Sequence, residues 1–236
     1  MLHKLKRLCR DPIGVLRSRY SDFRDHQRYK SGADYHAADY WEARLGKFGN
    51  SLRGVGIDGF SEDENTKQYA AARETFISLC RNADVDFASS SILEIGCGTG
   101  FYTNIVHELG ASEYVGVDIT NTLFDKLTAE FSDFQFLKID VATEPLDASF
   151  DIVIMIDVTQ HIVTSEKFSH AMQNIRSHLN PGGLFIVTSW LDATARSNFY
   201  ETSRDLADYQ HEFPNCEFTE PVPFRDKFIF SVRVES

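Results

Sequence analysis

Three glycines at alternate positions follow directly on an apolar run that reads as a strand. Residues 92–100 are Ile-Leu-Glu-Ile-Gly-Cys-Gly-Thr-Gly. A chain that ends a strand, turns sharply and lets a ligand touch its backbone needs residues without a Cβ atom. The dinucleotide pattern G-x-G-x-x-G would require glycine at position 101, where this chain has Phe101. The loop therefore predicts a ligand that contacts the backbone, with a glycine spacing that differs from the dinucleotide pattern. The glycines could also merely shape a tight turn.

Carboxylates end the apolar runs that follow this loop. The second run ends in Asp118, 18 positions after Gly100, and the third and fourth end in Asp140 and Asp157. An acidic residue about 20 positions beyond such a loop is placed to accept hydrogen bonds from two ribose hydroxyls. Asp118 could instead cap a helix, and Asp140 a turn. Because the glycine loop, Asp118 and Asp140 all fall at the carboxyl ends of consecutive strands, where open α/β sheets bind ligands, they favour a cofactor site.

Strands and helices alternate along the chain beyond residue 90. Strands are expected near residues 92–95, 113–118, 134–140, 150–157, 184–190, 216–220 and 227–234, and helices near 64–81, 102–109, 123–131, 168–179 and 196–209. We expect turns at Asn180 to Gly183 and over most of residues 205–214. This alternation, with strands apolar on both faces, predicts an α/β fold whose parallel sheet is covered on both sides.

The spacing Glu94-x-Gly96-x-Gly98-x-Gly100 resembles motif I of the class I S-adenosylmethionine (SAM) methyltransferases. The resemblance implies a Rossmann-like, seven-stranded, mostly parallel sheet with helices on both faces, whose last strand is antiparallel. That domain would span residues 90–236, with an N-terminal helical arm and cap over residues 1–89. The implied cofactor is SAM, with Asp140 and Val141 at its adenine. The cofactor-binding residues expected in this part of the chain are Glu94, Gly96, Cys97, Gly98, Gly100, Asp118, Ile119, Asp140, Val141 and Asp157.

An arginine on the helix ahead of the first strand is a further cofactor candidate. Asn65, Tyr69 and Arg73 lie at i, i+4 and i+8, on one face of that helix. Such a polar stripe usually faces solvent, but this helix leads into the glycine loop. A similar helix arginine in ubiquinone-biosynthesis-type O-methyltransferases and in protein N-terminal methyltransferases pairs with the methionine carboxylate of SAM. By that resemblance Arg73 is expected to bind the same group, since a guanidinium matches a carboxylate in two parallel hydrogen bonds.

Aromatic residues in the cap are candidates for binding the methyl acceptor. Tyr35, Tyr40 and Trp41 lie close together in the sequence, and Arg44 follows them. They could be packing residues, or they could form a lid that closes over the cofactor and excludes water. The segment resembles the N-terminal lid of the two families named above. We therefore include the three aromatic residues among the substrate-binding candidates.

His161 is the candidate catalytic residue. Methyl transfer needs no attacking group on the protein, so the enzyme contributes alignment and dehydration. An alcohol or phenol acceptor must lose a proton, however, and a histidine is a natural base. His161 follows Asp157 by four residues and could serve as that base or only buttress the fold. Trp190, at the end of the fifth strand, could line the acceptor pocket or pack under the C-terminal helix.

The formal net charge of −11 argues against nucleic acid as a partner. Residues 1–30 nevertheless hold nine Lys and Arg against three Asp and Glu. This basic arm could be a solvated helix or could contact an anionic partner such as an acidic protein or a membrane surface. No apolar run approaches the roughly 18 residues that span a bilayer.

Cysteine usage favours a reducing compartment. Cys9, Cys80, Cys97 and Cys216 are scattered, with no CxxC pair. This pattern is expected of a cytoplasmic protein and argues against a structural metal site.

These observations predict a SAM-dependent methyltransferase that acts on an O or N atom of a small molecule, such as a sugar, a secondary metabolite or a biosynthetic intermediate. One alternative is a protein or peptide N-terminal methyltransferase, because Tyr40-Trp41 and Val117-Asp-Ile-Thr resemble those enzymes. Another is a nucleotide-binding partner subunit without methyl transfer. The sequence specifies neither the acceptor nor the oligomeric state.

Overall fold

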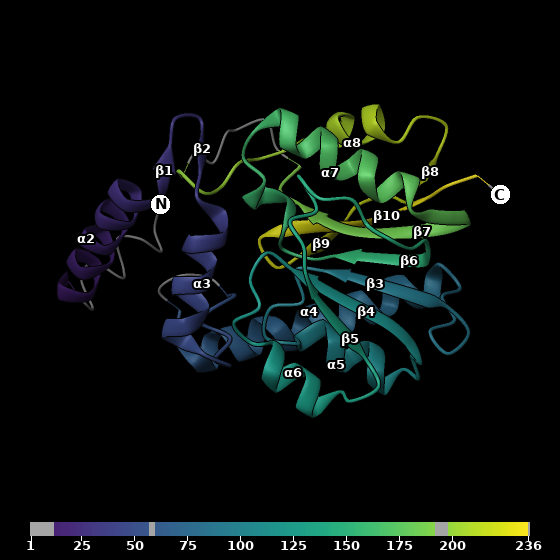
Figure 1. Ribbon diagram of the computed structural model, residues 1–236, viewed down its shortest axis with the longest axis horizontal. Coiled ribbons are helices and arrows are strands. Elements are labelled where there is room, and N and C mark those ends of the chain that lie inside the picture. The colour runs from purple at the N-terminus through teal and green to yellow at the C-terminus, as the bar shows by residue number, and fades with distance from the viewer. Residues whose placement is uncertain (1–11, 57–59, 192–197, 236) are drawn as a thin grey trace.

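A mixed sheet forms the centre of the molecule in the computed structural model, which describes residues 12–56, 60–191 and 198–235 (Figure 1). Its strands are β3 (Ser91–Ile95), β4 (Glu113–Asp118), β5 (Gln135–Lys138), β6 (Phe150–Met155), β7 (Leu179–Ser189), β8 (Glu217–Phe218), β9 (Val222–Phe224) and β10 (Lys227–Arg233). The strand order is β5-β4-β3-β6-β7-β10-β8, and β9 also pairs with β10. The strands β5, β4, β3, β6 and β7 run parallel to one another, and β10 runs antiparallel to β7. The predicted Rossmann-like, mostly parallel sheet is therefore confirmed.

The sheet has eight strands instead of the expected seven because its last edge is divided in two. Phe218 pairs with Val232 in β8, and Val222 pairs with Ile229 in β9. Both segments lie against the same strand, with a one-residue shift in register between them. A shift of this kind bends the edge strand and increases its twist. After β9, residues 225–226 form a tight connection that leads the chain into β10.

Helices cover both faces of the sheet, as Figure 1 shows. The helices of the domain are α4 (Glu62–Asn82), α5 (Phe101–Glu108), α6 (Phe124–Glu130), the 3-10 helix η1 (Thr159–His161), α7 (Ser165–Ser177) and α8 (Leu206–Glu212). Residues of α4, α5 and α6 pack with Ile92 on one face, and residues of α7 and α8 pack with Leu93 on the other. Side chains of neighbouring strand residues point to opposite faces, so one strand supplies both cores.

A helical cap precedes the sheet domain. It consists of α2 (Pro12–Tyr29), the hairpin β1 (Lys30–Ser31) and β2 (Asp34–Tyr35), and α3 (Ala37–Phe48). Tyr29, Tyr35 and Tyr40 form its buried centre and pack against Phe199 and Tyr200 of the sheet domain. The chain then enters α4 through a capping box, in which Ser61 and Glu64 bond each other's backbone N–H groups. These aromatic contacts hold the cap over the carboxyl ends of the strands.

Three local expectations were wrong. Residues 205–214, expected to be mostly turn, contain α8, which begins at a second capping box between Asp205 and Asp208. The helix expected over 196–209 is not present over residues 198–205, where Asn198 and Glu201 form an isolated bridge; residues 196–197 lie outside the described residues. The expected turn at Asn180 to Gly183 lies inside β7 as a bulge, because the pairing of β7 with β6 is irregular between Phe150 and Ile152.

Within the described ranges, no helix is long and apolar enough to cross a membrane. The same residues contain no group of three or more His, Cys, Asp or Glu side chains arranged to hold a metal ion.

Candidate active site

The glycine loop leaves β3 in a conformation that favours glycine. Gly96 has φ of 79° and Gly98 has φ of 49°, both in the left-handed region. A Cβ atom on Gly96 would lie 2.3 Å from Cγ2 of Val158. The loop backbone therefore comes close to the segment after β6, and the N–H groups of Gly96 and Cys97 donate to the carbonyl of Val117.

Asp118 ties the tips of β3 and β4 together. Its carboxylate accepts hydrogen bonds from the N–H of Gly98 at 3.0 Å and from the N–H of Thr120 at 3.1 Å. Burial raises the pKa of Asp118 to about 6, and the three backbone N–H groups nearby oppose that rise. A carboxylate can accept about four hydrogen bonds, so Asp118 retains acceptor capacity for hydroxyl groups of a ligand.

Glu94 lies at the centre of a buried hydrogen-bond network. It is 2% exposed and accepts hydrogen bonds from Tyr114 at 2.5 Å and from Thr103 at 2.9 Å. Burial raises the pKa of Glu94 to about 7, although both hydroxyl donors favour the ionised form. Glu94 lines the cavity described below, but these contacts direct one of its oxygens into the protein.

The raised pKa of Glu94 predicts a pH-dependent loss of stability that Glu94→Gln removes. The folded-state value of about 7 exceeds the ordinary value of 4.5, so the folded protein holds a proton that the unfolded chain has released. The stabilisation is complete below about pH 4.5 and is lost as the pH rises through about 7, by roughly 3 kcal/mol. Urea unfolding between pH 5 and 8 checks this. The pKa of Asp118 is raised in both the wild-type protein and Glu94→Gln, so the difference between their pH profiles of stability isolates the contribution of Glu94. Parallel pH profiles of the two proteins would contradict it.

A cavity of about 960 Å³ of empty volume opens beside the glycine loop, between the sheet edge and the cap. The predicted site residues that line it are Tyr35, Trp41, Glu94, Gly96, Cys97, Gly98, Asp118, Ile119, Asp140, Val141, Asp157 and His161. The structure thus brings together residues from the cap and from the ends of four strands.

The cavity is divided by charge. The described side chains on its sheet side include four carboxylates, those of Glu94, Asp118, Asp140 and Asp157, and no lysine or arginine. The cap side presents apolar and aromatic side chains, namely Tyr35, Ala37, Trp41 and Leu45. One end therefore suits a cationic, hydroxyl-bearing ligand, and the other suits an uncharged and largely apolar one.

Arg73 does not fulfil its predicted role. Its guanidinium forms an ion pair with Glu108 of α5 at 2.8 Å and is one-third exposed, and Arg73 does not line the cavity. The stripe on α4 turns gradually from the cavity to the surface, so Asn65 and Tyr69 are buried whereas Arg73 reaches the outer side of α5. We therefore withdraw Arg73 as the carboxylate-binding residue.

Three other predicted residues lie beside the cavity without lining it. Trp190 is buried and donates a hydrogen bond to Asp226 at 3.0 Å, so it packs against the β9–β10 hairpin. Tyr40 belongs to the aromatic centre of the cap, stacked on Tyr200. Gly100 caps the N-terminus of α5. None of them is a wall residue.

His161 lines the cavity, but both of its ring nitrogens have neighbours. Nδ1 lies 2.9 Å from the carbonyl oxygen of Tyr200, and Nε2 lies 3.2 Å from the side-chain amide of Gln160. The carbonyl can only accept, so Nδ1 carries the proton. Burial lowers the pKa of His161 to about 3, and the Tyr200 carbonyl only partly opposes this. His161 is therefore a neutral imidazole that connects the cap to η1, with Tyr35 donating to its backbone carbonyl at 3.1 Å.

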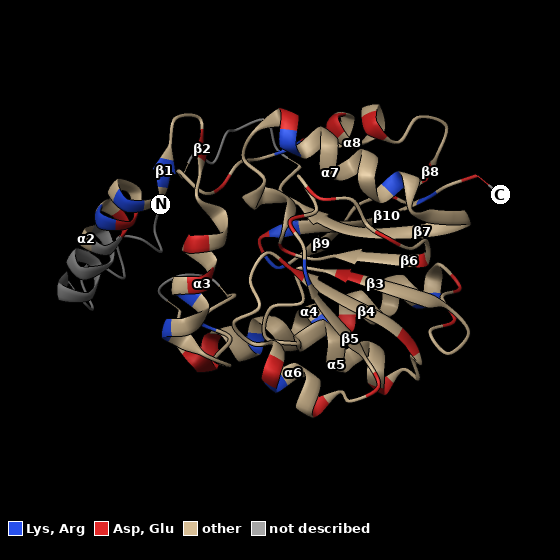
Figure 2. Ribbon diagram, in the orientation of Figure 1, with Lys and Arg blue, Asp and Glu red and all other residues tan. Residues whose placement is uncertain are grey.

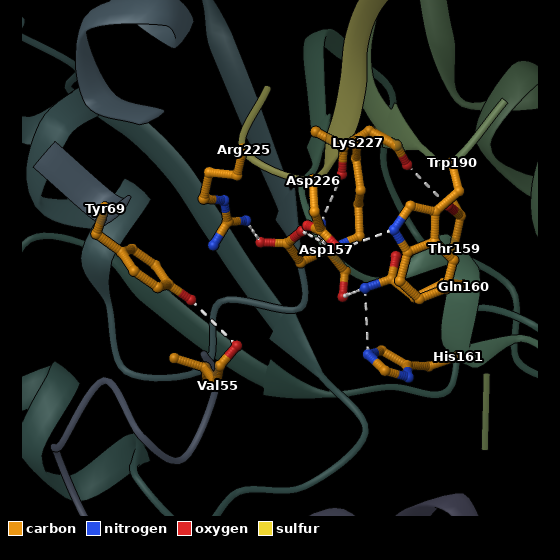
Figure 3. A network of polar contacts seen from close by, with 11 residues as sticks. Val55, Tyr69, Asp157, Thr159, Gln160, His161, Trp190, Arg225, Asp226 and Lys227 are labelled. Carbon is orange, nitrogen blue, oxygen red and sulfur yellow. Dashed lines mark hydrogen bonds and ion pairs between the residues drawn. The ribbon is translucent and has the colours of Figure 1, made fainter. Parts of the chain in front are cut away.

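Asp157 lies beside two cations from the β9–β10 hairpin, as Figure 3 shows. Its carboxylate forms ion pairs with Arg225 and, at 3.1 Å, with Lys227. Both cationic side chains are less than one-tenth exposed. Asp157 has φ of 60°, which is uncommon for a residue with a side chain and directs its carboxylate toward these partners. The hairpin residues Arg225 and Lys227 were not among the predicted site residues.

The cavity contains other residues that the sequence patterns did not single out for the site. They include Val55 and Tyr69 ahead of β3, and Phe101 and Tyr102 at the start of α5. The position of Tyr102, two residues after Gly100, is the one signal that could have identified it. Tyr69 was recognised only as part of a helical stripe.

Known proteins share the sequence pattern and the fold of this domain. Residues 93–185 match a family model described as a methyltransferase domain. The magnesium protoporphyrin IX methyltransferase of Synechocystis, solved with bound S-adenosylhomocysteine (SAH), superimposes with a TM-score of 0.65 at 16% identity, covering 84% of this chain and 97% of that one. The described domain therefore has the fold of this methyltransferase, and residues 93–185 are similar to a methyltransferase domain.

Curated relatives cover the same region. The compactin nonaketide synthase of Penicillium citrinum is 34% identical over 109 residues, which are 41% of this chain and 4% of that protein. The ubiquinone biosynthesis O-methyltransferase of Cereibacter sphaeroides is 31% identical over 132 residues, 54% of this chain and 50% of that protein. An amino-sugar N,N-dimethyltransferase of Streptomyces venezuelae is 27% identical over 128 residues, 52% of each. The chain thus spans about half the length of the smaller curated relatives and 4% of the synthase.

Proposed function

We propose that this protein binds SAM in the cavity beside the glycine loop and transfers its methyl group to an oxygen or nitrogen atom of a small molecule. The observation that carries the proposal is the division of the cavity by charge. The ammonium and the ribose hydroxyls of SAM match the carboxylates of Asp118, Asp140 and Asp157 at one end, of which Asp157 is itself paired with Arg225 and Lys227. The apolar cap side is left for the acceptor.

The residues present fit the cofactor. Asp118 holds the glycine loop in place and keeps acceptor capacity toward ribose hydroxyls. Asp140 and Val141 line the same end of the cavity, where an adenine would lie between the tips of β4 and β5. Gly96 also lines this end, and its backbone packs against Val158 because it has no Cβ atom. Bound SAM would supply an electrophilic methyl group on a positively charged sulfur.

The chain's own contribution to the reaction is to position the reactants and exclude water. Tyr35 bonds to η1, and the indole N–H of Trp41 donates to the Tyr35 hydroxyl at 3.2 Å. These contacts close the cap side of the cavity with aromatic rings. Holding two reactants in line in a dry site contributes roughly 7–11 kcal/mol to such a reaction.

We infer that His161 positions the cavity wall and does not accept the proton of the acceptor, contrary to the role expected from its place in the sequence. A group with a pKa of about 3 is a weak base near neutral pH. His161→Asn should therefore keep turnover within about tenfold, with no ionisation lost from the pH–rate profile between pH 6 and 8. Loss of turnover by about 1,000-fold with SAH binding intact would restore the catalytic role.

Incubation with methyl-labelled SAM and a small-molecule extract tests the proposal. We expect a labelled product of low molecular mass, detected by mass spectrometry, with wild-type protein but not with Asp118→Ala. Label on protein N-termini would instead support the peptide methyltransferase alternative. Absence of any labelled product, with SAH binding shown, would support a partner subunit without methyl transfer.

A further inference from the structure

Two buried side chains near the Tyr69 wall of the cavity each carry one hydrogen-bond donor without an acceptor among the described residues. Tyr102 lines the cavity and is 6% exposed, and its hydroxyl has no hydrogen-bond partner within the described residues. The side chain of Arg225 is 4% exposed, and its Nε likewise has no hydrogen-bond acceptor there. Buried donors are nearly always satisfied in native proteins. This pair therefore points to an acceptor group supplied by a ligand.

The two donors lie near one another although they come from distant segments. The Arg225 guanidinium lies 4.7 Å above the ring of Tyr69, which is a wall residue. Burial raises the pKa of Tyr102, and the positive charge of Arg225 opposes that rise. Figure 3 shows Arg225 between Tyr69 and Asp157. Within the described residues, Tyr102 thus lines the cavity with an unpartnered hydroxyl, and the guanidinium lies against the ring of Tyr69.

The same end of the cavity holds the group of opposite charge. Asp157 lines the cavity, and its carboxylate pairs with Arg225 and Lys227. Lys227 also pairs with Asp226 at 3.2 Å, so two cations and two carboxylates balance one another. A ligand group that is neutral overall but carries both charges can enter this cluster without leaving a buried charge uncompensated. An α-amino acid group has this composition.

We propose that Tyr102 and Arg225 form the receptor for the α-carboxylate of the methionyl part of SAM, with Asp157 facing its α-ammonium group. Tyr102 donates directly, and Arg225 supplies the positive charge from behind Tyr69. The proposal rests on the proposed function above and gives the carboxylate a partner in place of Arg73. It makes the β9–β10 hairpin, which lies outside the segment matched by the family, part of the cofactor site.

Calorimetric titration with three ligands tests the receptor. SAH carries both the carboxylate and the ammonium group, its decarboxylated form carries only the ammonium group, and 5′-methylthioadenosine carries neither. We expect wild-type protein to prefer SAH over the decarboxylated form by at least tenfold. Arg225→Gln should bring this ratio close to one, and Tyr102→Phe should lower it about threefold to tenfold, since hydrogen bonds to charged groups contribute about 1.5–3 kcal/mol. Both variants should bind 5′-methylthioadenosine within about threefold of wild type.

Arg73→Gln is the matched control, because it removes the same charge from the pair with Glu108 outside the cavity. It should keep the wild-type ratio. A wild-type ratio in both Arg225→Gln and Tyr102→Phe overturns the proposal, as does a ratio that collapses in Arg73→Gln. If Arg225→Gln does not fold, Tyr102→Phe alone decides by the same criterion. Wild-type protein that binds none of the three ligands contradicts the proposed function itself, which is a different outcome.

Discussion

Asp118→Ala is expected to weaken binding of SAH by about 100-fold. The carboxylate has two tasks at the tip of β4. It accepts the N–H groups of Gly98 and Thr120, which fixes the glycine loop, and it offers its remaining acceptor sites to ribose hydroxyls. Hydrogen bonds to a charged group contribute about 1.5–3 kcal/mol each, and 1.4 kcal/mol corresponds to a tenfold change in affinity. Isothermal titration calorimetry with SAH measures the loss.

Asp125→Ala is the control for this variant. Asp125 lies in the first turn of α6 and is exposed, so its replacement removes the same charge without touching the loop. It should leave the dissociation constant within about twofold of wild type. An affinity of Asp118→Ala equal to that of the control would show that the ribose does not bind at β4.

Gly96→Ala is expected to lower the free energy of unfolding by about 2–6 kcal/mol. Two costs add at this position. Alanine would adopt φ near 79°, which L residues disfavour, at about 1–3 kcal/mol. Its Cβ would also lie 2.3 Å from Val158 Cγ2, and overpacking costs a further 1–3 kcal/mol or so. The midpoint of urea unfolding should therefore fall clearly.

Two companion variants separate these costs. Gly46 lies in α3 with no atom near the added Cβ, so Gly46→Ala should be neutral or stabilise by up to about 1 kcal/mol. Adding Val158→Ala to Gly96→Ala removes the clash but not the backbone strain, and should recover part of the loss. If Gly96→Ala unfolds at the wild-type midpoint, the close approach of the loop to Val158 is not as described.

The sequence predicted the placement of residues correctly where that placement depends on local spacing. Gly96, Gly98 and Asp118 lie at strand tips whose positions the apolar runs define, and the sheet places them at one edge. His161 was correctly placed near the cavity by its distance from Asp157. Its chemistry was not predictable, because the low pKa results from burial under the cap and from the carbonyl of Tyr200.

The failures depend on contacts between segments far apart in the chain. Arg73 lies on the predicted helix face, but its partner Glu108 is 35 residues away and draws it to the surface. All residues of β7 near Trp190 are buried, so alternation of exposure could not show which way the indole points. Arg225 reaches Asp157 across 68 positions, and only the pairing of β10 with β7 brings them together.

The cap shows the same limit in a cluster of aromatic residues. The sequence grouped Tyr35, Tyr40 and Trp41 without separating lid from packing. In the structure Tyr35 and Trp41 line the cavity, whereas Tyr40 stacks on Tyr200. Neighbours in the sequence therefore divide between the two roles, because adjacent helix positions lie about 100° apart around the axis.

The basic arm remains a prediction. Figure 2 shows lysines and arginines on α2 and α3, and residues 1–11 lie outside the described part of the chain.

Calorimetry of the purified, folded wild-type chain with SAH, and separately with NAD, tests the central claim most directly. The geometry of the glycine loop, Asp118 and the four cavity carboxylates predicts one SAH bound per chain and no binding of NAD. Heat of binding with NAD alone, or with neither ligand, would contradict the assignment of this cavity to SAM.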